Sequence, residues 1–353
     1  MKAAKTPYRQ PWIGNSRFDL TWILGPSFIS IAILLLLPDK IRSGSAMPLA
    51  AWVTLIVFID VAHVYSTLLR TYLDPVRFER HRTLFLVAPV ACYAVGVLLY
   101  SIDDMLFWRV LAYLAVFHFI RQQYGLMRLY SREEKFSSIY KWIDKIIIYA
   151  ATIYPVLWWH LHPDRNFNWF TEGDFIFLEA GWLLPVLDII YVLILTAYII
   201  KEISLIRQTR SLNIPRNTII LGTILSWYAG IVLFNGDLAF TLLNVVSHGI
   251  PYMALVWLMA KKEKNSREAP GIRNMFFRQY GVVLFLGLLF FLAWFEEGLW
   301  DALVWREHSE AFTLFMGLPR LDDKALLSLV VPLLSLPQSS HYVLDGFIWK
   351  KGS

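Results

Sequence analysis

The sequence predicts an all-α integral membrane protein, a polytopic bundle of about ten transmembrane helices with both termini in the cytoplasm. Composition is the first reason, because 57% of the 353 residues are hydrophobic and only 17% are charged, whereas about a quarter of a soluble domain is charged. The second reason is the number of long apolar runs, and the third is where the basic residues fall between them. We therefore expect residues 1–353 to form a single transmembrane domain.

Ten apolar runs approach the length of about 20 residues that a helix needs to cross a bilayer. They fall at residues 22–38, 48–69, 83–101, 105–125, 143–161, 180–200, 217–234, 238–260, 280–299 and 325–348. The last run contains Pro332 and Pro337, which a span tolerates where neighbouring groups satisfy the freed backbone. Two long connections, 160–179 and 296–323, are expected at the outer face. The second is a candidate for an interfacial helix, because Leu299, Ala302 and Trp305 recur at helical spacing.

The distribution of basic residues supports an even number of spans. With these ten spans, 26 of the 33 lysines and arginines fall on the side of the N-terminus. Positive residues favour the cytoplasmic side of a membrane, so both termini are expected there, most simply in a bacterial inner membrane. The net charge of +6 then reflects topology, and no nucleic-acid partner is expected. Cys92 is the single cysteine, which excludes an intramolecular disulfide and thiolate-cluster chemistry.

Four of the eight histidines lie inside predicted spans, and this is unusual because ionisable groups in a membrane are costly. They are His63, His118, His248 and His341, one in each of four spans that run from outside to inside. At about 1.5 Å per residue they share a layer roughly 10–18 Å below the cytoplasmic surface. The remaining four, His81, His160, His162 and His308, fall in connections and are interpreted as solvated or interfacial.

Each of the four has a polar companion three or four residues away, on the same helical face. These companions are Asp60, Gln122, Asn244 and Asp345, with Gln338 three residues before His341. Imidazole and carboxylate together are the ligand set of non-heme iron, so His63, His118, His248, His341, Asp60 and Asp345 are predicted metal ligands. Gln122, Asn244, Gln338, Arg121, Tyr65 and Tyr342 are predicted second-sphere or substrate-contacting residues.

A metal site within the bilayer favours an oxidoreductase that uses O2 on a long apolar lipid or isoprenoid, because a dry pocket protects reactive species from side reactions. Iron is the expected metal, mononuclear or dinuclear, with manganese and zinc as alternatives. Where the reaction needs electrons, a cytoplasmic donor would supply them. No catalytic residue beyond the metal centre is predicted.

Two other interpretations remain open at this stage. Paired histidines on facing helices also ligate b-type haem, although haem ligation does not need adjacent carboxylates. Histidine and aspartate also form proton relays in transporters, and Pro337 and Pro251 would supply the helix breaks typical of that class. No internal repeat supports the transporter interpretation.

The scattered histidines also resemble a known family. Integral-membrane alkane hydroxylases and fatty acid desaturases carry HxxxH and HxxHH motifs, which this chain lacks. Single histidines at 63, 118 and 248, followed by HYVLD at 341–345, are more similar to Brp/Blh-type membrane β-carotene dioxygenases. This chain has HxxxD where such a family would have HxxxH. The resemblance implies iron held by histidines of several transmembrane helices, O2 as co-substrate and an isoprenoid substrate.

Overall fold

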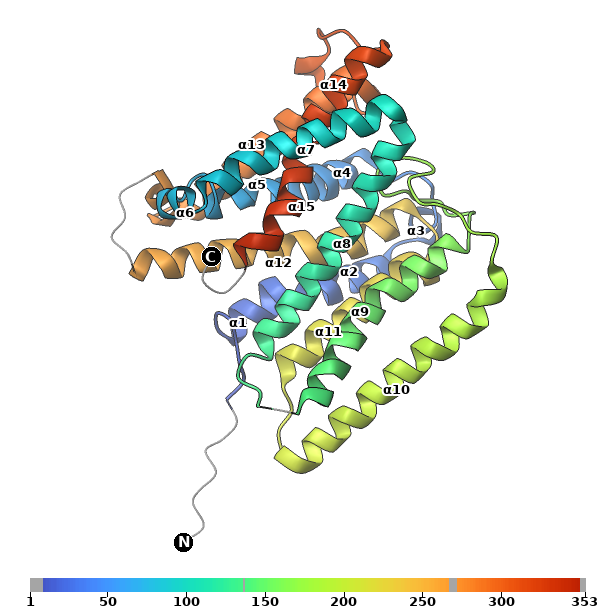
Figure 1. Ribbon diagram of the computed structural model, residues 1–353, viewed down its shortest axis with the longest axis vertical. Coiled ribbons are helices and arrows are strands. Elements are labelled where there is room, and N and C mark those ends of the chain that lie inside the picture. Colours follow the sequence, from blue (N-terminus) through green and yellow to red (C-terminus); the bar gives the residue numbers. More distant parts are fainter. Residues whose placement is uncertain (1–8, 136, 267–271, 350–353) are drawn as a thin grey trace. The chain divides into compact units, whose positions relative to one another are not determined.

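The computed structural model describes residues 9–135, 137–266 and 272–349, and every regular element in these ranges is helical. Figure 1 shows the course of the helices along the chain. Seven helical stretches are long and apolar enough to cross a membrane, which confirms an all-α chain of membrane-protein character. They are Ser16–Leu36, Leu49–Arg70 (through η2, Val53–Val61, and α5, Ala62–Ser66), Arg82–Ile102 (α7), Gly181–Thr209 (with α10, Leu184–Thr209), Ile214–Leu233 (with α11, Ile214–Trp227), Asp237–Glu263 (in α12, Asp237–Ser266) and Gly281–Trp305 (with α13, Gly281–Trp300).

Three of the ten predicted spans coincide with helices that are not among these seven, so the count of ten is not established. They are α8 (Asp104–Tyr130), α9 (Ser138–His160) and the pair α14 (Lys324–Leu334) and α15 (Leu336–Ile348). Charged and amide side chains within α8 and α9 lower their hydropathy. The last span is interrupted at Ser335, and Pro337 lies in the first turn of α15, where the missing proline N–H costs no helical hydrogen bond.

The chain divides into two compact units, which are described separately. One unit comprises described residues within 9–43, 119–166 and 177–248, and the other those within 44–118, 167–176 and 249–349. The division falls inside α8, between His118 and Phe119, and inside α12, between His248 and Gly249.

The first unit contains a buried ionic cluster formed by α9, α10, α11 and the segment before α9. The Lys201 ammonium bonds Asp144 and Glu202. Arg216 bonds Glu202, with a nitrogen 2.8 Å from Glu134 and 3.4 Å from Asp144. Burial raises the pKa of Glu134, while the charge of Arg216 opposes that rise. Such pairing is what allows charged side chains to be buried within an otherwise apolar unit.

The second unit has an apolar core between η2, α5, α12 and α13, which includes Val57, Val61, Val256 and Leu289. Gly249 permits the close approach of α12 to η2, because a Cβ there would lie 2.9 Å from Cγ2 and 3.0 Å from the carbonyl oxygen of Ile59. This packing places η2 and α5, the elements before and around His63, against α12.

The two long connections predicted at 160–179 and 296–323 both contain ordered structure. In the predicted loop 160–179, the Asp174 carboxylate accepts backbone N–H bonds from Trp169 and Phe170 at 3.0 and 2.6 Å. Burial raises the pKa of Asp174 to about 6 despite these bonds. In 296–323, Leu299 lies in α13, and Ala302 and Trp305 lie in the π-helical turn Asp301–Trp305 that continues it and ends at Arg306, with φ 61°.

We expect Gly298→Ala to destabilise the second unit, because a Cβ at this position in α13 would lie 2.3 Å from the buried ring of Phe315. Overpacking of this kind costs about 1–3 kcal/mol. Gly287→Ala in the same helix is the matched control, since no atom lies within 4 Å of its added Cβ. Thermal unfolding of the detergent-solubilised variants measures both effects. An equal or higher melting temperature for Gly298→Ala would contradict the close packing of α13.

Candidate metal centre

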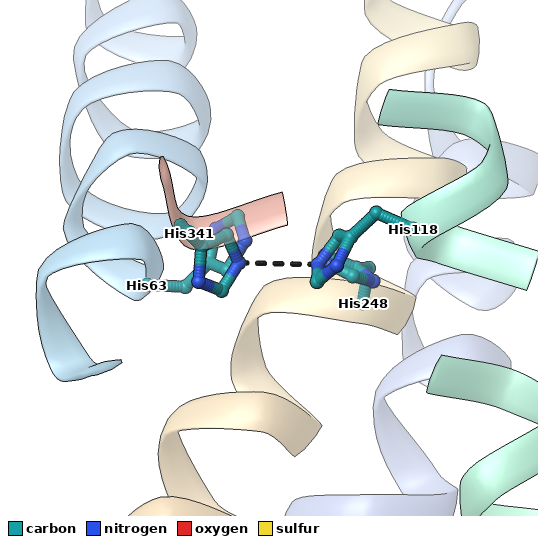
Figure 2. A group of neighbouring side chains, drawn as sticks. All are labelled: His63, His118, His248 and His341. Carbon is teal, nitrogen blue, oxygen red and sulfur yellow. Dashed lines mark hydrogen bonds between the residues drawn. The ribbon is translucent and has the colours of Figure 1, made fainter. Parts of the chain in front are cut away.

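Four different helices deliver the four predicted histidines to one place. His63 lies in α5, immediately after the π-helical segment η2, and His118, His248 and His341 lie in α8, α12 and α15. π-Helical turns are frequent beside functional sites, because they shift the face that the following residues present. His63, His118 and His341 belong to the second unit, and His248 directly precedes that unit's Gly249 in the unbroken helix α12. Figure 2 shows the four side chains.

The four imidazoles are buried and convergent. Each offers a ring nitrogen, and these four atoms all lie within 4.8 Å of one another, while no ring is more than 3% exposed. The Nε2 atoms of His118 and His341 are 3.1 Å apart (Figure 2). Metal–nitrogen bonds of ~2.1 Å place two ligand nitrogens ~3.0 Å apart at a right angle and ~3.4 Å apart at a tetrahedral angle. The spacing therefore fits two nitrogens bound to one ion.

The Nδ1 atoms of the same two rings face other partners. His341 Nδ1 lies 2.6 Å from the Thr67 hydroxyl, which also lies 3.1 Å from the Tyr252 hydroxyl. His118 Nδ1 lies 3.5 Å from the Asp345 carboxylate. A hydrogen bond at one ring nitrogen fixes the tautomer and leaves the other nitrogen as a lone-pair donor. Thr67 thus suits Nε2 of His341 to metal binding. The nearby Asp345 carboxylate favours a proton on Nδ1 of His118, which leaves Nε2 of that ring as its lone-pair donor.

The two carboxylates predicted as ligands lie beside the histidines. Among the described residues, the group of convergent donor atoms contains histidines alone. Asp60 lies 3.6 Å from Nδ1 of His63, and Asp345 accepts hydrogen bonds from Tyr252 and, at 3.2 Å, from the Trp349 indole. These are the positions of groups that orient imidazole ligands.

Two predicted companions contact backbone rather than a ring nitrogen. Gln122 donates its amide N–H to the carbonyl of His248 at 2.9 Å, and Asn244 donates to the carbonyl of Phe240 at 2.9 Å. The His248 ring instead stacks on Phe119, with centroids 3.5 Å apart and planes at 7°. Aromatic stacking fixes the orientation of this imidazole.

The other four residues predicted as second-sphere or substrate-contacting have different surroundings. Arg121 is exposed and donates to the Tyr149 hydroxyl at 2.9 Å. Tyr65 donates to Glu296 at 2.5 Å. Tyr342 is buried, with its ring 5.0 Å from His118 and 5.7 Å from His341. Gln338 is half-buried in the first part of α15.

The predicted site residues do not include Thr67 or Tyr252, although the sequence carries a signal for both. Thr67 follows His63 by four residues, and Tyr252 follows His248 by four, so each shares a helical face with a histidine. The predicted polar companions are carboxylates and amides, and tyrosines near the histidine layer are commonly interfacial anchors; of these tyrosines the prediction includes Tyr65 and Tyr342 alone.

We expect Thr67→Val to weaken metal binding by about 10–100-fold, because it removes the partner of His341 Nδ1 while keeping the side-chain shape. Thr54→Val is the control, since Thr54 is exposed and bonds only the Ala50 carbonyl among the interactions described. Competition with a chelator of known affinity measures the change. Equal affinity in the two variants would mean that Thr67 does not act through the histidine.

Comparison with known proteins adds no assignment: the chain matches no protein-family model, no curated protein and no solved structure.

Proposed function

We propose that the protein is an integral-membrane, non-heme iron oxygenase, hydroxylase or desaturase that acts on a long apolar lipid or isoprenoid. The observation that supports this is the group of four buried imidazoles, drawn from separate helices of an apolar, membrane-spanning chain. Buried ionisable side chains inside membrane helices are retained for function more often than for stability.

The donor set suits a transition metal. Imidazole nitrogens bind iron, copper, zinc and nickel, and they do not suit Mg²⁺ or Ca²⁺. Iron, when bound by His63, His118, His248 and His341, would supply the binding and activation of O2. One compact group of four donors supports a mononuclear site better than a dinuclear one. Zinc and manganese are the alternatives that a metal analysis separates from iron.

The surrounding residues have three roles in this proposal. Burial of all four rings, to 3% exposure or less, excludes bulk water from the centre. Thr67 and Asp345 orient His341 and His118. Tyr252 and Trp349 hold the Asp345 carboxylate by donating hydrogen bonds to it, so its second oxygen stays beside His118.

The proposed topology has ten spans, with α8, α9 and the α14–α15 pair added to the seven apolar stretches. This arrangement supports cytoplasmic termini, because it gathers most basic residues on the side of the N-terminus. The centre would then lie in the cytoplasmic half of a bacterial inner membrane, within reach of a cytoplasmic electron donor.

The spacing of the imidazoles favours this proposal over haem. Axial nitrogens on a haem iron lie on opposite faces of the porphyrin, ~4 Å apart on one straight line. The Nε2 atoms of His118 and His341 are 3.1 Å apart, and four rings rather than two converge. No observation on the described residues favours a transporter.

The test is elemental analysis of the purified protein, followed by O2 consumption with membrane-lipid and isoprenoid extracts and a chemical reductant. We expect about one iron per chain and lipid-dependent O2 uptake that is lost with the metal. A purified chain with no bound transition metal after growth in iron-rich medium would overturn the proposal. One metal per chain without any lipid-dependent O2 uptake would support the metal centre and contradict the oxygenase activity.

A further inference from the structure

The second unit contains a cavity of about 290 Å³, and two of the helices that line it, α8 and α15, also carry His118 and His341. Its volume is close to the lower end of the range for small-molecule pockets, about 300–1,000 Å³. It lies among α7, α8, α14 and α15. Four of the six α7 residues that line it are small and leave space between the helices. These are Ala88, Ala91, Cys92 and Gly96.

The lining of the cavity is apolar and partly exposed. Phe107, Val110, Leu111 and Leu114 of α8 and Pro332 of α14 complete most of the wall, and Cys92 and Ser339 are its only side chains with a polar atom among the described residues. Ala91, Val95 and Val110 are exposed at its edge. Because α7 is long and apolar enough to cross a membrane, this edge would face the hydrocarbon of the bilayer in the proposed topology.

One stripe of α8 connects the cavity to the histidines. Phe107, Leu111 and Leu114 line the cavity, and His118 follows Leu114 by four residues on the same face. Four residues of α-helix correspond to ~6 Å. Tyr342 packs in the same apolar cluster as Phe107 and Leu111, and its ring lies 5.0 Å from that of His118. Tyr342 therefore adjoins both the apolar cluster that includes these two wall residues and the ring of His118.

We propose that this cavity binds one hydrocarbon chain of a membrane lipid, which enters sideways between α7 and α8, and that Tyr342 separates the bound chain from the histidines. The identification of this hydrocarbon chain as part of the enzyme's substrate rests on the proposed function. The binding of a hydrocarbon chain in the cavity does not. A hydrocarbon chain is the occupant because the wall offers dispersion contacts and almost no hydrogen-bonding group. A volume of about 290 Å³ is of the size that one hydrocarbon chain fills.

The matched variants are Ala91→Trp and Ala94→Trp. Both alanines are exposed residues of α7, but Ala91 lines the cavity and Ala94 does not. The full-length protein, purified in detergent, is incubated with a palmitic acid analogue that carries a diazirine near its chain end, irradiated, digested and mapped by mass spectrometry. Iron content is measured on the same preparations. Val95→Trp, exposed and also lining the cavity, replaces Ala91→Trp should that variant fail to fold.

Labelling of the cavity-lining peptides of α7 and α8 is expected in the wild type and in Ala94→Trp, and about a tenfold drop is expected in Ala91→Trp, equivalent to ~1.4 kcal/mol. Cys92, the single cysteine, gives a second readout: its alkylation by N-ethylmaleimide should slow when the probe is present. Equal labelling in all three proteins, or labelling confined to other peptides, overturns the inference. Labelling of the cavity in an iron-free protein would support the hydrocarbon-chain site and contradict the proposed metal function. Bound iron without labelling of the cavity would support the metal function and contradict the hydrocarbon-chain site.

Discussion

His341→Ala is expected to lower the affinity for the bound metal by more than ~100-fold, the upper end of the loss caused by outer-sphere changes alone. His341 lies close to two other rings of the group: its Nε2 is 3.1 Å from that of His118, and its ring centroid is 5.1 Å from that of His63. Removing it deletes one of the four imidazole donors. Inductively coupled plasma mass spectrometry of the purified variant measures the metal retained per chain.

The control is His162→Ala, because His162 stacks on Trp158 and is not part of the convergent group. We expect it to retain the metal content of the wild type. Asp345→Asn is expected to weaken retention less than His341→Ala does, since the carboxylate lies beside His118 Nδ1. Wild-type metal content in His341→Ala would remove the metal centre. A loss in Asp345→Asn as large as that in His341→Ala would make the carboxylate itself a ligand.

Lys201→Met is expected to destabilise the first unit by about 3–5 kcal/mol, the cost of removing one partner from a buried ionic group. Lys201 is 2% exposed and bonds both Asp144 and Glu202. Methionine has a similar length and leaves the two carboxylates with Arg216 as their remaining cation in this cluster. Thermal or denaturant unfolding in detergent measures the change.

Two controls separate the ionic effect from a general loss of charge. Lys261→Met removes an exposed lysine and is expected to change stability by less than ~0.5 kcal/mol. The double variant Lys201→Met/Asp144→Leu is expected to recover part of the loss, because replacing both partners of a buried pair by apolar groups is often close to neutral. A single variant Lys201→Met as stable as the wild type would mean that the cluster contributes nothing to the fold.

The ionic cluster also shows where sequence reasoning ends. Asp144, Lys201 and Arg216 each fall at the edge of an apolar run, where a charged residue is normally interfacial. Their mutual contacts depend on how α9, α10 and α11 pack, and residues 57 or 72 positions apart in the chain form the bonds. No local pattern carries that information.

The sequence by itself determined that the chain is helical and that its composition is that of a membrane protein. It also identified four histidines in apolar runs as the candidate site residues. These properties follow from hydropathy and helical spacing, which are local. Only the tertiary structure decided that the four rings converge, that Asp60 and Asp345 lie beside Nδ1 atoms, and that Thr67 and Tyr252 complete the surroundings. The direction in which a side chain points around its helix axis depends on helix packing, on the π-helical turn before His63 and on the break at Ser335, and these are properties of the folded chain.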